Sequence, residues 1–319
     1  MRKLICLTAL CLFTATVAAE TVVVSLEKDN AIAILDAQEG KLNKTVPVGQ
    51  RPRGIALSAD QKSLFVATSD DHTIKIFDTS SWKESGRLPS GEDPETFALS
   101  PDGKLMYVSN EDDSQVTVID IAAKKAIKTI KVGVEPEGIA ASADGKWLVS
   151  ASETTNMLHW IDTQNWSIVE NTLVDPRPRA ASFTADSVEL WATSEMAGTV
   201  VVVDAASKQI THTIKLEVPG LNNDLIQPVG VLIDKNRRYA YVALGPANRV
   251  AVINAKTYQV EQYLLVGQRV WNLAFSSDQQ RLFTTNGLSN DVSIIDLANF
   301  KVTKSVAVGR YPWGVAVKP

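Results

Sequence analysis

The chain has 319 residues, of which 45% are hydrophobic and 21% are charged, and its formal net charge is −4. This composition excludes a disordered, collagen-like or membrane-embedded chain and indicates a folded protein with an ample apolar core. The slight excess of acidic residues argues against general binding to nucleic acids or to anionic membranes.

Residues 1–19 have the pattern of a secretory signal peptide. A basic start precedes an apolar run that ends at Val17, and two alanines follow as a cleavage point. The run is shorter than the ~20 apolar residues that a membrane-spanning helix needs. We therefore predict a secreted protein of a bacterial periplasm, whose mature chain is 20–319. Cys6 and Cys11 are lost with the signal peptide, which excludes disulfides, thiolate catalysis and cysteine metal sites.

From residue 20 onward, the predicted elements are short strands that recur with a period of 42 residues, interrupted once by a spacing of 50. The first marker of the repeat is the end of an apolar strand, at Asp36, Asp78, Asp120, Asp162, Asp204, Asn254 and Asp296. The second is a proline position, at Pro52, Pro94, Pro136, Pro178, Pro228, Val270 and Pro312. The third is a turn residue, at Asp60, Asp102, Asp144, Asp186, Asn236 and Asp278. Such a period is typical of propeller blades or of solenoid units.

The content of each unit favours the propeller. Within 94–133 the pattern predicts four strands, at 96–99, 105–109, 116–119 and 127–132, and no helical periodicity. Seven such units predict an all-β fold, a single-domain seven-bladed β-propeller of four-stranded antiparallel blades. Because the mature chain begins at the second strand of a blade and ends at an innermost strand, we expect the N- and C-terminal strands to pair in one blade and close the ring.

The strand sequences also carry a family resemblance. Tyr107-Val108-Ser109-Asn110 and Val118-Ile119-Asp120 resemble the YVTN repeat, which fits the whole mature chain. Longer stretches, such as 49–54, 152–157 and 309–314, resemble the subfamily associated with pyrroloquinoline-quinone (PQQ)-dependent alcohol catabolism. The resemblance implies an accessory role in quinoprotein-linked alcohol oxidation. The implied partner is a quinoprotein dehydrogenase or a transporter component, and no catalytic residues are implied.

One face of the disc carries the candidate site. In a propeller, the loop entering each innermost strand and the loop after each second strand lie on one side, around the mouth of the central channel. The residues beside the proline positions differ from blade to blade, which favours a binding site over an incidental solvated face. We predict that a ligand or partner binds through Arg51, Arg53, Glu95, Glu137, Arg177, Arg179, Arg269, Trp271, Arg310, Tyr311 and Trp313.

A second set of residues follows the second strand of each blade on the same face. Four of these positions hold glutamate, at Glu27, Glu111, Glu153 and Glu195. They allow two interpretations, a cation or amine site and salt bridges with arginines of the channel mouth. Calcium ligands lie within ~2.6 Å of the ion whereas packed sheets are ~10 Å apart, which favours the salt bridges. An insertion within 217–227, on this same face, is either a tolerated loop or a lid.

The chain contains no recognisable catalytic or metal-binding motif. His72, His159 and His212 occupy non-equivalent positions in different blades, and no pair has metal-ligand spacing. The repeated aspartates are explained as turn residues whose side chains bond their own backbone. We therefore predict a monomeric binding or scaffold protein with no catalytic residue, no metal, no cofactor and no membrane span.

Two other functions stay open at this point. Some seven-bladed propellers hydrolyse sugar lactones, so a lactone hydrolase is the enzymatic alternative. Single-stranded DNA binding is the second alternative, with Trp271, Trp313 and the arginines as a stacking and electrostatic surface. The acidic net charge counts against nucleic acid as a partner.

Overall fold

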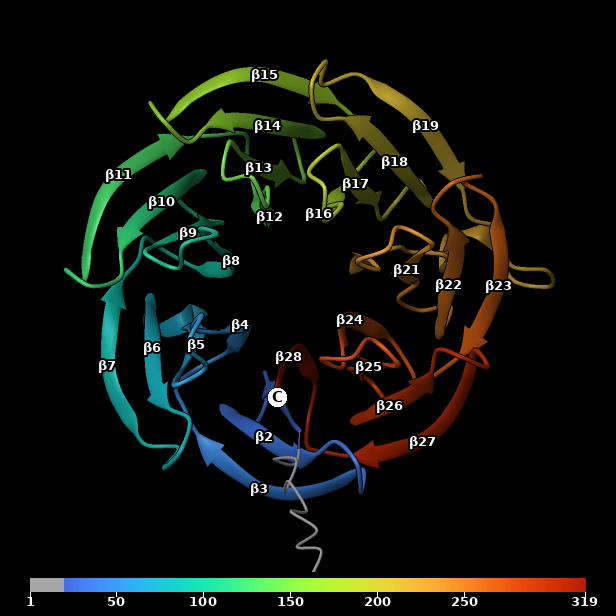
Figure 1. Cartoon of the computed structure of the whole chain (residues 1–319), viewed down its shortest axis with the longest axis horizontal. Helices are drawn as coiled ribbons and strands as arrows, with labels where there is room; N and C mark the ends of the chain where they lie inside the picture. Colours follow the sequence, from blue (N-terminus) through green and yellow to red (C-terminus); the bar gives the residue numbers. More distant parts are fainter. Residues whose placement is uncertain (1–19) are drawn as a thin grey trace, which may run out of the picture.

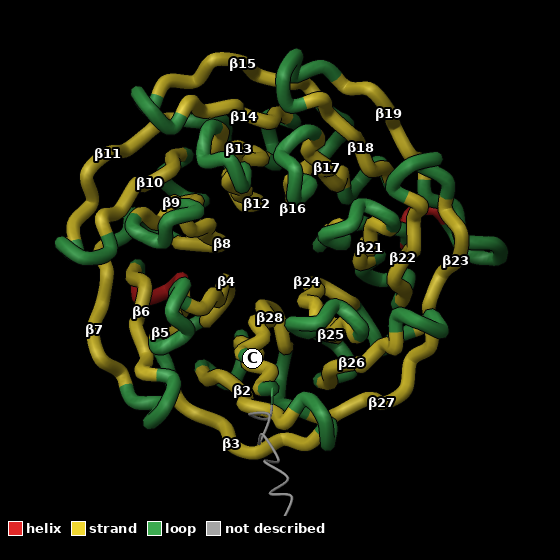
Figure 2. The backbone as a smooth tube through the Cα atoms, viewed as in Figure 1, coloured by secondary structure: helices red, strands yellow, loops and turns green. Residues whose placement is uncertain are grey.

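The computed structural model describes residues 20–319, and the predicted signal peptide lies outside these residues. Seven four-stranded antiparallel sheets surround a central axis and follow one another in sequence order (Figure 1). The predicted all-β, seven-bladed propeller is therefore confirmed. Figure 2 shows that strands and short loops make up nearly all of the backbone, with two short helices beside them.

Blades 1 to 4 each run outward from an innermost strand at the channel to a fourth strand at the rim. Blade 1 contains β28 (Pro312–Lys318), β1 (Thr21–Leu26), β2 (Ala31–Asp36) and β3 (Lys41–Pro47). Blade 2 contains β4 (Pro52–Leu57), β5 (Ser63–Thr68), β6 (Thr73–Asp78) and β7 (Glu84–Pro89). Blade 3 contains β8 (Pro94–Leu99), β9 (Leu105–Asn110), β10 (Gln115–Asp120) and β11 (Lys125–Lys131). Blade 4 contains β12 (Pro136–Ala141), β13 (Trp147–Ser152), β14 (Met157–Asp162) and β15 (Ser167–Leu173).

The remaining blades and the helices complete the ring. Blade 5 contains β16 (Pro178–Phe183), β17 (Glu189–Ser194), β18 (Thr199–Asp204) and β19 (Ile210–Lys215). Blade 6 contains β20 (Val231–Ile233), β21 (Tyr239–Ala243), β22 (Arg249–Asn254) and β23 (Val260–Leu265). Blade 7 contains β24 (Val270–Phe275), β25 (Arg281–Asn286), β26 (Asp291–Asp296) and β27 (Lys301–Ala307). The 3₁₀ helices are η1 (Ser69–Asp71) and η2 (Asn223–Leu225).

Burial follows the same order in each blade. The second and third strands are almost entirely buried, because both of their faces pack against neighbouring blades. The fourth strands form the outer rim and are largely exposed, as in β11 and β15. The innermost strands use glycine where two blades touch. A Cβ atom on Gly138 would lie 2.5 Å from the carbonyl oxygen of Arg179, so no larger residue fits there.

The two ends of the described chain meet in blade 1. Strand β1 pairs with both β2 and β28, so that Val23 lies opposite Ile34 on one side and Ala316 on the other. The predicted closure of the ring by the terminal strands is therefore present. It leaves no unpaired edge of β1 at the channel.

The repeated aspartates hold the turns between the first and second strands. Asp102 Oδ1 accepts hydrogen bonds from the hydroxyl of Ser100 at 2.7 Å and from the N–H of Lys104 at 3.1 Å. These bonds lower the pKa of Asp102 to about 2. Blade 6 differs at the serine position and at the aspartate position of this turn. Asp234 stands where the other blades with this turn have serine or threonine, and its carboxylate accepts three N–H groups of its own turn. The turn interpretation of these residues is confirmed.

The spacing of 50 residues arises from an insertion between β19 and β20. The insertion contains η2, and its Val218 and Ile226 are buried in the core between blades 5 and 6. Packing of these two residues anchors the loop against the ring. None of the helices in residues 20–319 has the length and apolar character of a membrane span.

Candidate binding site at the channel mouth

Backbone hydrogen bonds bring the two predicted residue sets together. In every blade except blade 6, the residue before the proline position is left-handed, as in Asp93 (φ 46°) and Arg177 (φ 64°). Its carbonyl oxygen accepts the N–H of the residue after the second strand, Glu111 at 3.0 Å and Glu195 at 2.8 Å. The same bond recurs in blades 1, 2, 4 and 7. Each such bond therefore joins an inner-strand loop to the loop that carries the second set.

A β-bulge follows the proline position in the innermost strands of blades 2, 3, 4, 5 and 7. Bulges re-aim side chains at the ends of sheets. The first residue of the bulge, such as Glu95 in blade 3 or Arg179 in blade 5, contacts charged groups of neighbouring blades. The charged residues beside the prolines consequently form one network instead of separate surface groups.

Blades 1 to 3 supply the first part of this network. Arg51 donates hydrogen bonds to Asp93 at 2.9 Å and to Glu95 at 2.5 Å. Arg53 lies 3.1 Å from Glu95 and 3.4 Å from Glu27. Glu95 is only 1% exposed, so the two guanidinium groups offset the cost of burying its carboxylate.

Blades 4 and 5 supply the second part. Arg179, itself buried, pairs with Glu137 at 2.6 Å, with Glu153, and with Glu195 at 3.6 Å. Arg177 also reaches Glu153, at 2.8 Å, and Glu195, at 3.2 Å. The glutamates at 27, 153 and 195 therefore form salt bridges with arginines of the channel mouth, the arrangement favoured from the sequence.

We call these groups the channel network. Its five arginines are Arg51, Arg53, Arg177, Arg179 and Arg269. Its seven acids are Glu27, Asp93, Glu95, Glu111, Glu137, Glu153 and Glu195. The acids outnumber the arginines by two, and protons on buried carboxyl groups offset part of this excess.

Two carboxyl pairs carry those protons. Burial and the adjacent Glu95 carboxylate raise the pKa of Glu111 to about 8. Burial likewise raises the pKa of Glu137 well above its usual range. Burial alone would raise the pKa of Glu153, but the hydrogen bond from Glu137 and the charge of Arg179 lower it. Burial raises the pKa of Glu95 as well, although the charges of Arg53 and Arg51 act to lower it.

Two tryptophans extend the network to blades 7 and 1. The guanidinium of Arg269 lies 4.5 Å from the ring centroid of Trp271, and that of Arg53 lies 5.1 Å from the ring centroid of Trp313. Arg269 also approaches Glu195 at 3.4 Å. Both predicted tryptophans therefore join the charged residues through cation–π contacts.

Arg310 and Tyr311 lie apart from this arrangement. Arg310 is exposed and pairs with Asp29, at 2.6 Å, in the loop after β1. Tyr311 is 37% exposed, and the ammonium of Lys28 lies 5.9 Å from its ring centroid. These two residues remain open to solvent on the channel-mouth face.

A small cavity lies beneath the network, inside the channel. Its volume is about 160 Å³, and its lining includes Glu137, Arg179 and Trp313 from the first positions after the prolines. Ile139 and Leu273, two residues further along their strands, make the deeper part apolar. The sequence predicts the residues around the channel mouth but not this cavity, because the shape of the cavity depends on which small residues of seven strands meet at the axis.

The acids of blade 3 are the group that could hold a metal ion. Carboxylate oxygens of Asp93, Glu95 and Glu111 lie within 4.8 Å of one another. The guanidinium of Arg51 already contacts Asp93 and Glu95 and supplies the positive charge there. A cation at this position would have to displace Arg51, so the geometry favours the salt bridges.

Seven four-stranded blades with a buried charge network at the channel mouth define a β-propeller whose inner loops differ from blade to blade. A family model, YNCE-like beta-propeller, matches residues 30–230, and the chain belongs to this family. A search of curated proteins found none with significant similarity.

Solved structures share the fold over nearly the whole chain. Hydrazine synthase of Kuenenia stuttgartiensis has a TM-score of 0.80 at 20% identity, with 87% of this chain and 92% of that chain covered. A candidate 6-phosphogluconolactonase of Bacteroides fragilis has a TM-score of 0.77 at 16% identity, covering 96% of this chain and 99% of that chain. Dihydro-heme d1 dehydrogenase NirN has a TM-score of 0.67 at 16% identity, covering 90% and 63%. These neighbours have varied roles, so the likeness defines the fold alone.

Proposed function

We propose that this protein is a periplasmic binding protein, accessory to PQQ-dependent alcohol oxidation, that holds a small alcohol in the cavity beneath the channel mouth. One observation carries the proposal. Trp313 lines the cavity and is 4% exposed, yet its indole N–H has no acceptor among residues 20–319. A buried donor without an acceptor is costly, and a ligand oxygen would supply one.

The size and charge of the cavity favour an alcohol over an ion. A cavity of about 160 Å³ is close to the ~150 Å³ apolar cavity that binds benzene in an engineered protein. A hydroxyl group can accept from Trp313 and donate to the carbonyl oxygen of the Glu137 carboxyl group. A carboxylate ligand would have to compete with the glutamates that already pair with Arg179, and an ammonium ligand would meet the positive charge of Arg179. A short neutral alcohol avoids both problems while its chain contacts Ile139 and Leu273.

The rim of the mouth supports the second part of the proposal, a protein partner. Arg310 and Tyr311 are exposed there, and Met196 is 73% exposed. Aromatic, methionine and arginine side chains are enriched in protein interfaces. The resemblance to the PQQ-associated subfamily makes a quinoprotein dehydrogenase or a transporter component the partner that we propose.

The proposal is tested by calorimetric titration with 1-butanol, butanoate and butylammonium. We expect 1-butanol to bind most tightly, because it alone introduces no charge. Trp313→Phe removes the unpaired donor and should weaken 1-butanol binding about threefold or more. Ala180→Leu should weaken it about tenfold or more, because the added side chain fills the cavity that Ala180 lines.

Two matched variants on the opposite face serve as controls. Trp147→Phe and Ala206→Leu make the same chemical changes at residues outside the cavity lining and should leave the affinity unchanged. Thermal melting of all variants establishes that each is folded. Tighter binding of either ion than of 1-butanol, or equal effects of the cavity and control variants, would reject an alcohol site in the channel.

A lactone hydrolase is the second candidate, because two neighbouring glutamates with opposite pKa shifts are a common acid–base arrangement. Glu137 and Glu153 have such shifts. Both side chains are buried in salt bridges, so we expect purified protein to show no hydrolysis of glucono-1,5-lactone. Turnover that is lost in Glu153→Gln, while that variant stays folded, would make the protein an enzyme.

A further inference from the structure

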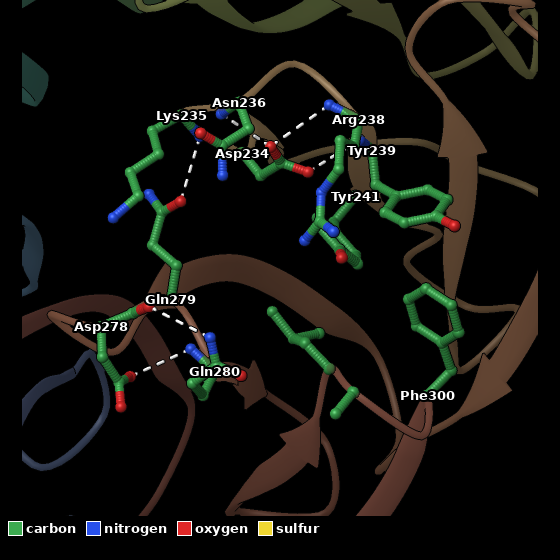
Figure 3. Close-up of a pocket in the computed structure, with 12 residues that line it drawn as sticks. Asp234, Lys235, Asn236, Arg238, Tyr239, Tyr241, Asp278, Gln279, Gln280 and Phe300 are labelled. Atoms are coloured by element: carbon green, nitrogen blue, oxygen red, sulfur yellow. Dashed lines mark hydrogen bonds between the residues drawn. The ribbon is translucent and has the colours of Figure 1, made fainter.

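A pocket of about 500 Å³ lies between blades 6 and 7, on the face opposite the channel mouth (Figure 3). Its walls come from the turns that follow β20, β24 and β26. Tyr239 and Phe300 form one side as a perpendicular aromatic pair with ring centroids 5.1 Å apart. Tyr241 lies in the lining and is 2% exposed. This volume lies within the ~300–1,000 Å³ range of small-molecule sites.

Ion pairs close the equivalent positions on either side of this pocket. The first residue of the second strand is Glu189 in blade 5, and it pairs with Arg237 of blade 6. In blade 7 the same position is Arg281, which donates to Glu20 of blade 1 at 2.8 Å. In blade 6 the same position holds Tyr239, and its neighbour across the boundary with blade 7 is Phe300. The boundary between blades 6 and 7 therefore lacks the ion pair found at both of these neighbouring boundaries.

Several hydrogen-bond donors of the pocket do not pair with the acidic residues that line it. Asp234 and Asp278 both accept from groups of their own turns. Lys235 and Arg238 are exposed, and neither forms a salt bridge with an acid in the described part of the chain. No hydrogen bond drawn in Figure 3 involves the hydroxyl of Tyr241. Burial raises the pKa of Tyr241, so this phenol remains a donor.

We propose that this pocket binds a small aromatic carboxylate. The carboxylate would accept hydrogen bonds from Lys235, Arg238 and the Tyr241 hydroxyl, and the ring would pack against Tyr239 and Phe300. Lys235 supports this assignment because it departs from the repeat: the equivalent residues of blades 2 to 5 are alanine or proline. This site is separate from the channel cavity, so its occupancy does not depend on the proposed alcohol binding.

Isothermal titration with 2-naphthoate tests the proposal, with 2-naphthamide and cyclohexanecarboxylate as comparison ligands. We expect 2-naphthoate to bind more tightly than both, because the amide lacks the charge and the saturated ring cannot stack. The double variant Lys235→Gln/Arg238→Gln should raise the Kd at least about tenfold. Tyr241→Phe should raise it about threefold or more.

Matched residues of blade 3 provide the controls. Lys104→Gln and Tyr107→Phe alter the repeat positions of Arg238 and Tyr241, and Trp166 already packs against the ring of Tyr107 at 5.8 Å. Neither should change the Kd. Because Lys235 and Arg238 are exposed, the double variant should fold even if Tyr241→Phe does not. Absence of saturable binding, equal affinity for the amide, or equal effects of the blade 3 variants would overturn the proposal.

Discussion

Two glutamic acids of the channel network have raised pKa values and lie next to a second carboxyl group. Glu111 is half-buried beside Glu95, and Glu137 is fully buried beside Glu153. In each pair a proton removes one negative charge from two neighbouring carboxyl groups. The network therefore ties the stability of the channel mouth to pH.

The stability of the wild-type protein should decrease as pH rises from 4.5 to about 8. Across this range folded Glu111 keeps a proton that the unfolded chain has released, so the folded state binds more protons and loses stability as pH rises. Glu111→Gln keeps a hydrogen-bond donor but cannot ionise. Relative to wild type, the variant should gain on the order of 1–2 kcal/mol at the upper end of the range, after discounting for solvent screening.

Urea unfolding at both ends of this range measures the effect. The wild-type free energy of unfolding should change more with pH than that of Glu111→Gln. The exposed Glu39→Gln provides the matched control and should follow the wild type. An identical pH dependence for wild type and Glu111→Gln would mean that Glu111 is ionised in the folded protein.

At the scale of the elements, blade 6 shows that one turn can be held in two ways. In blade 3 two side chains accept the N–H groups of the turn, the hydroxyl of Ser100 and the carboxylate of Asp102, and the hydroxyl also donates to the carboxylate. In blade 6 Asp234 alone accepts three N–H groups, and Asn236 occupies the usual aspartate position. The N–H donors of the turn therefore remain paired although both residues differ from the repeat.

Asp234→Ala should reduce the free energy of unfolding by about 1–3 kcal/mol, because three N–H groups of the turn lose their acceptor, the buried Asp234 carboxylate. Asp234→Ser restores the residue used by blades 2, 3, 4 and 7 and should cost less than half as much. Urea unfolding of the two variants gives the comparison. Equal losses for alanine and serine would show that the carboxylate holds the turn in a way that a hydroxyl cannot reproduce.

The elements were predictable from the sequence because their determinants are local and repeated seven times. Alternating strands, turn aspartates and the proline positions located the blades, with the strand ends of blade 3 off by at most two residues. The sequence predicted that glutamates and arginines of the channel mouth form salt bridges, but it did not predict which residues pair. Arg51 and Glu95, for example, are brought together by bulged strands of different blades. The two cavities could not be predicted, since each is the space left after side chains from several blades have packed.

The whole molecule depends on a single closure of the ring. Strand β28 pairs with β1 and packs beside β4 and β24, so it joins blade 1 to both neighbouring blades. A propeller that lost this strand would expose the edge of β1 and part of the channel lining. The geometry of the channel mouth therefore depends on closure of the ring.

Deletion of 312–319 should lower the melting temperature by on the order of 10 °C or abolish cooperative unfolding, because an innermost strand and its core contacts are lost. Deletion of Pro319 alone leaves β28 intact and should have no effect. Differential scanning calorimetry distinguishes these outcomes. An unchanged transition after the longer deletion would contradict closure by the terminal strands.

A crystal structure of the protein with 1-butanol would show whether the channel cavity of the intact ring holds a small alcohol. We expect electron density for butanol in the cavity, with its oxygen within hydrogen-bonding distance of Trp313 Nε1 and its chain against Ile139 and Leu273. Density for butanol elsewhere, with only water or an empty space beside Trp313 at saturating alcohol, would mean that the cavity is not an alcohol site.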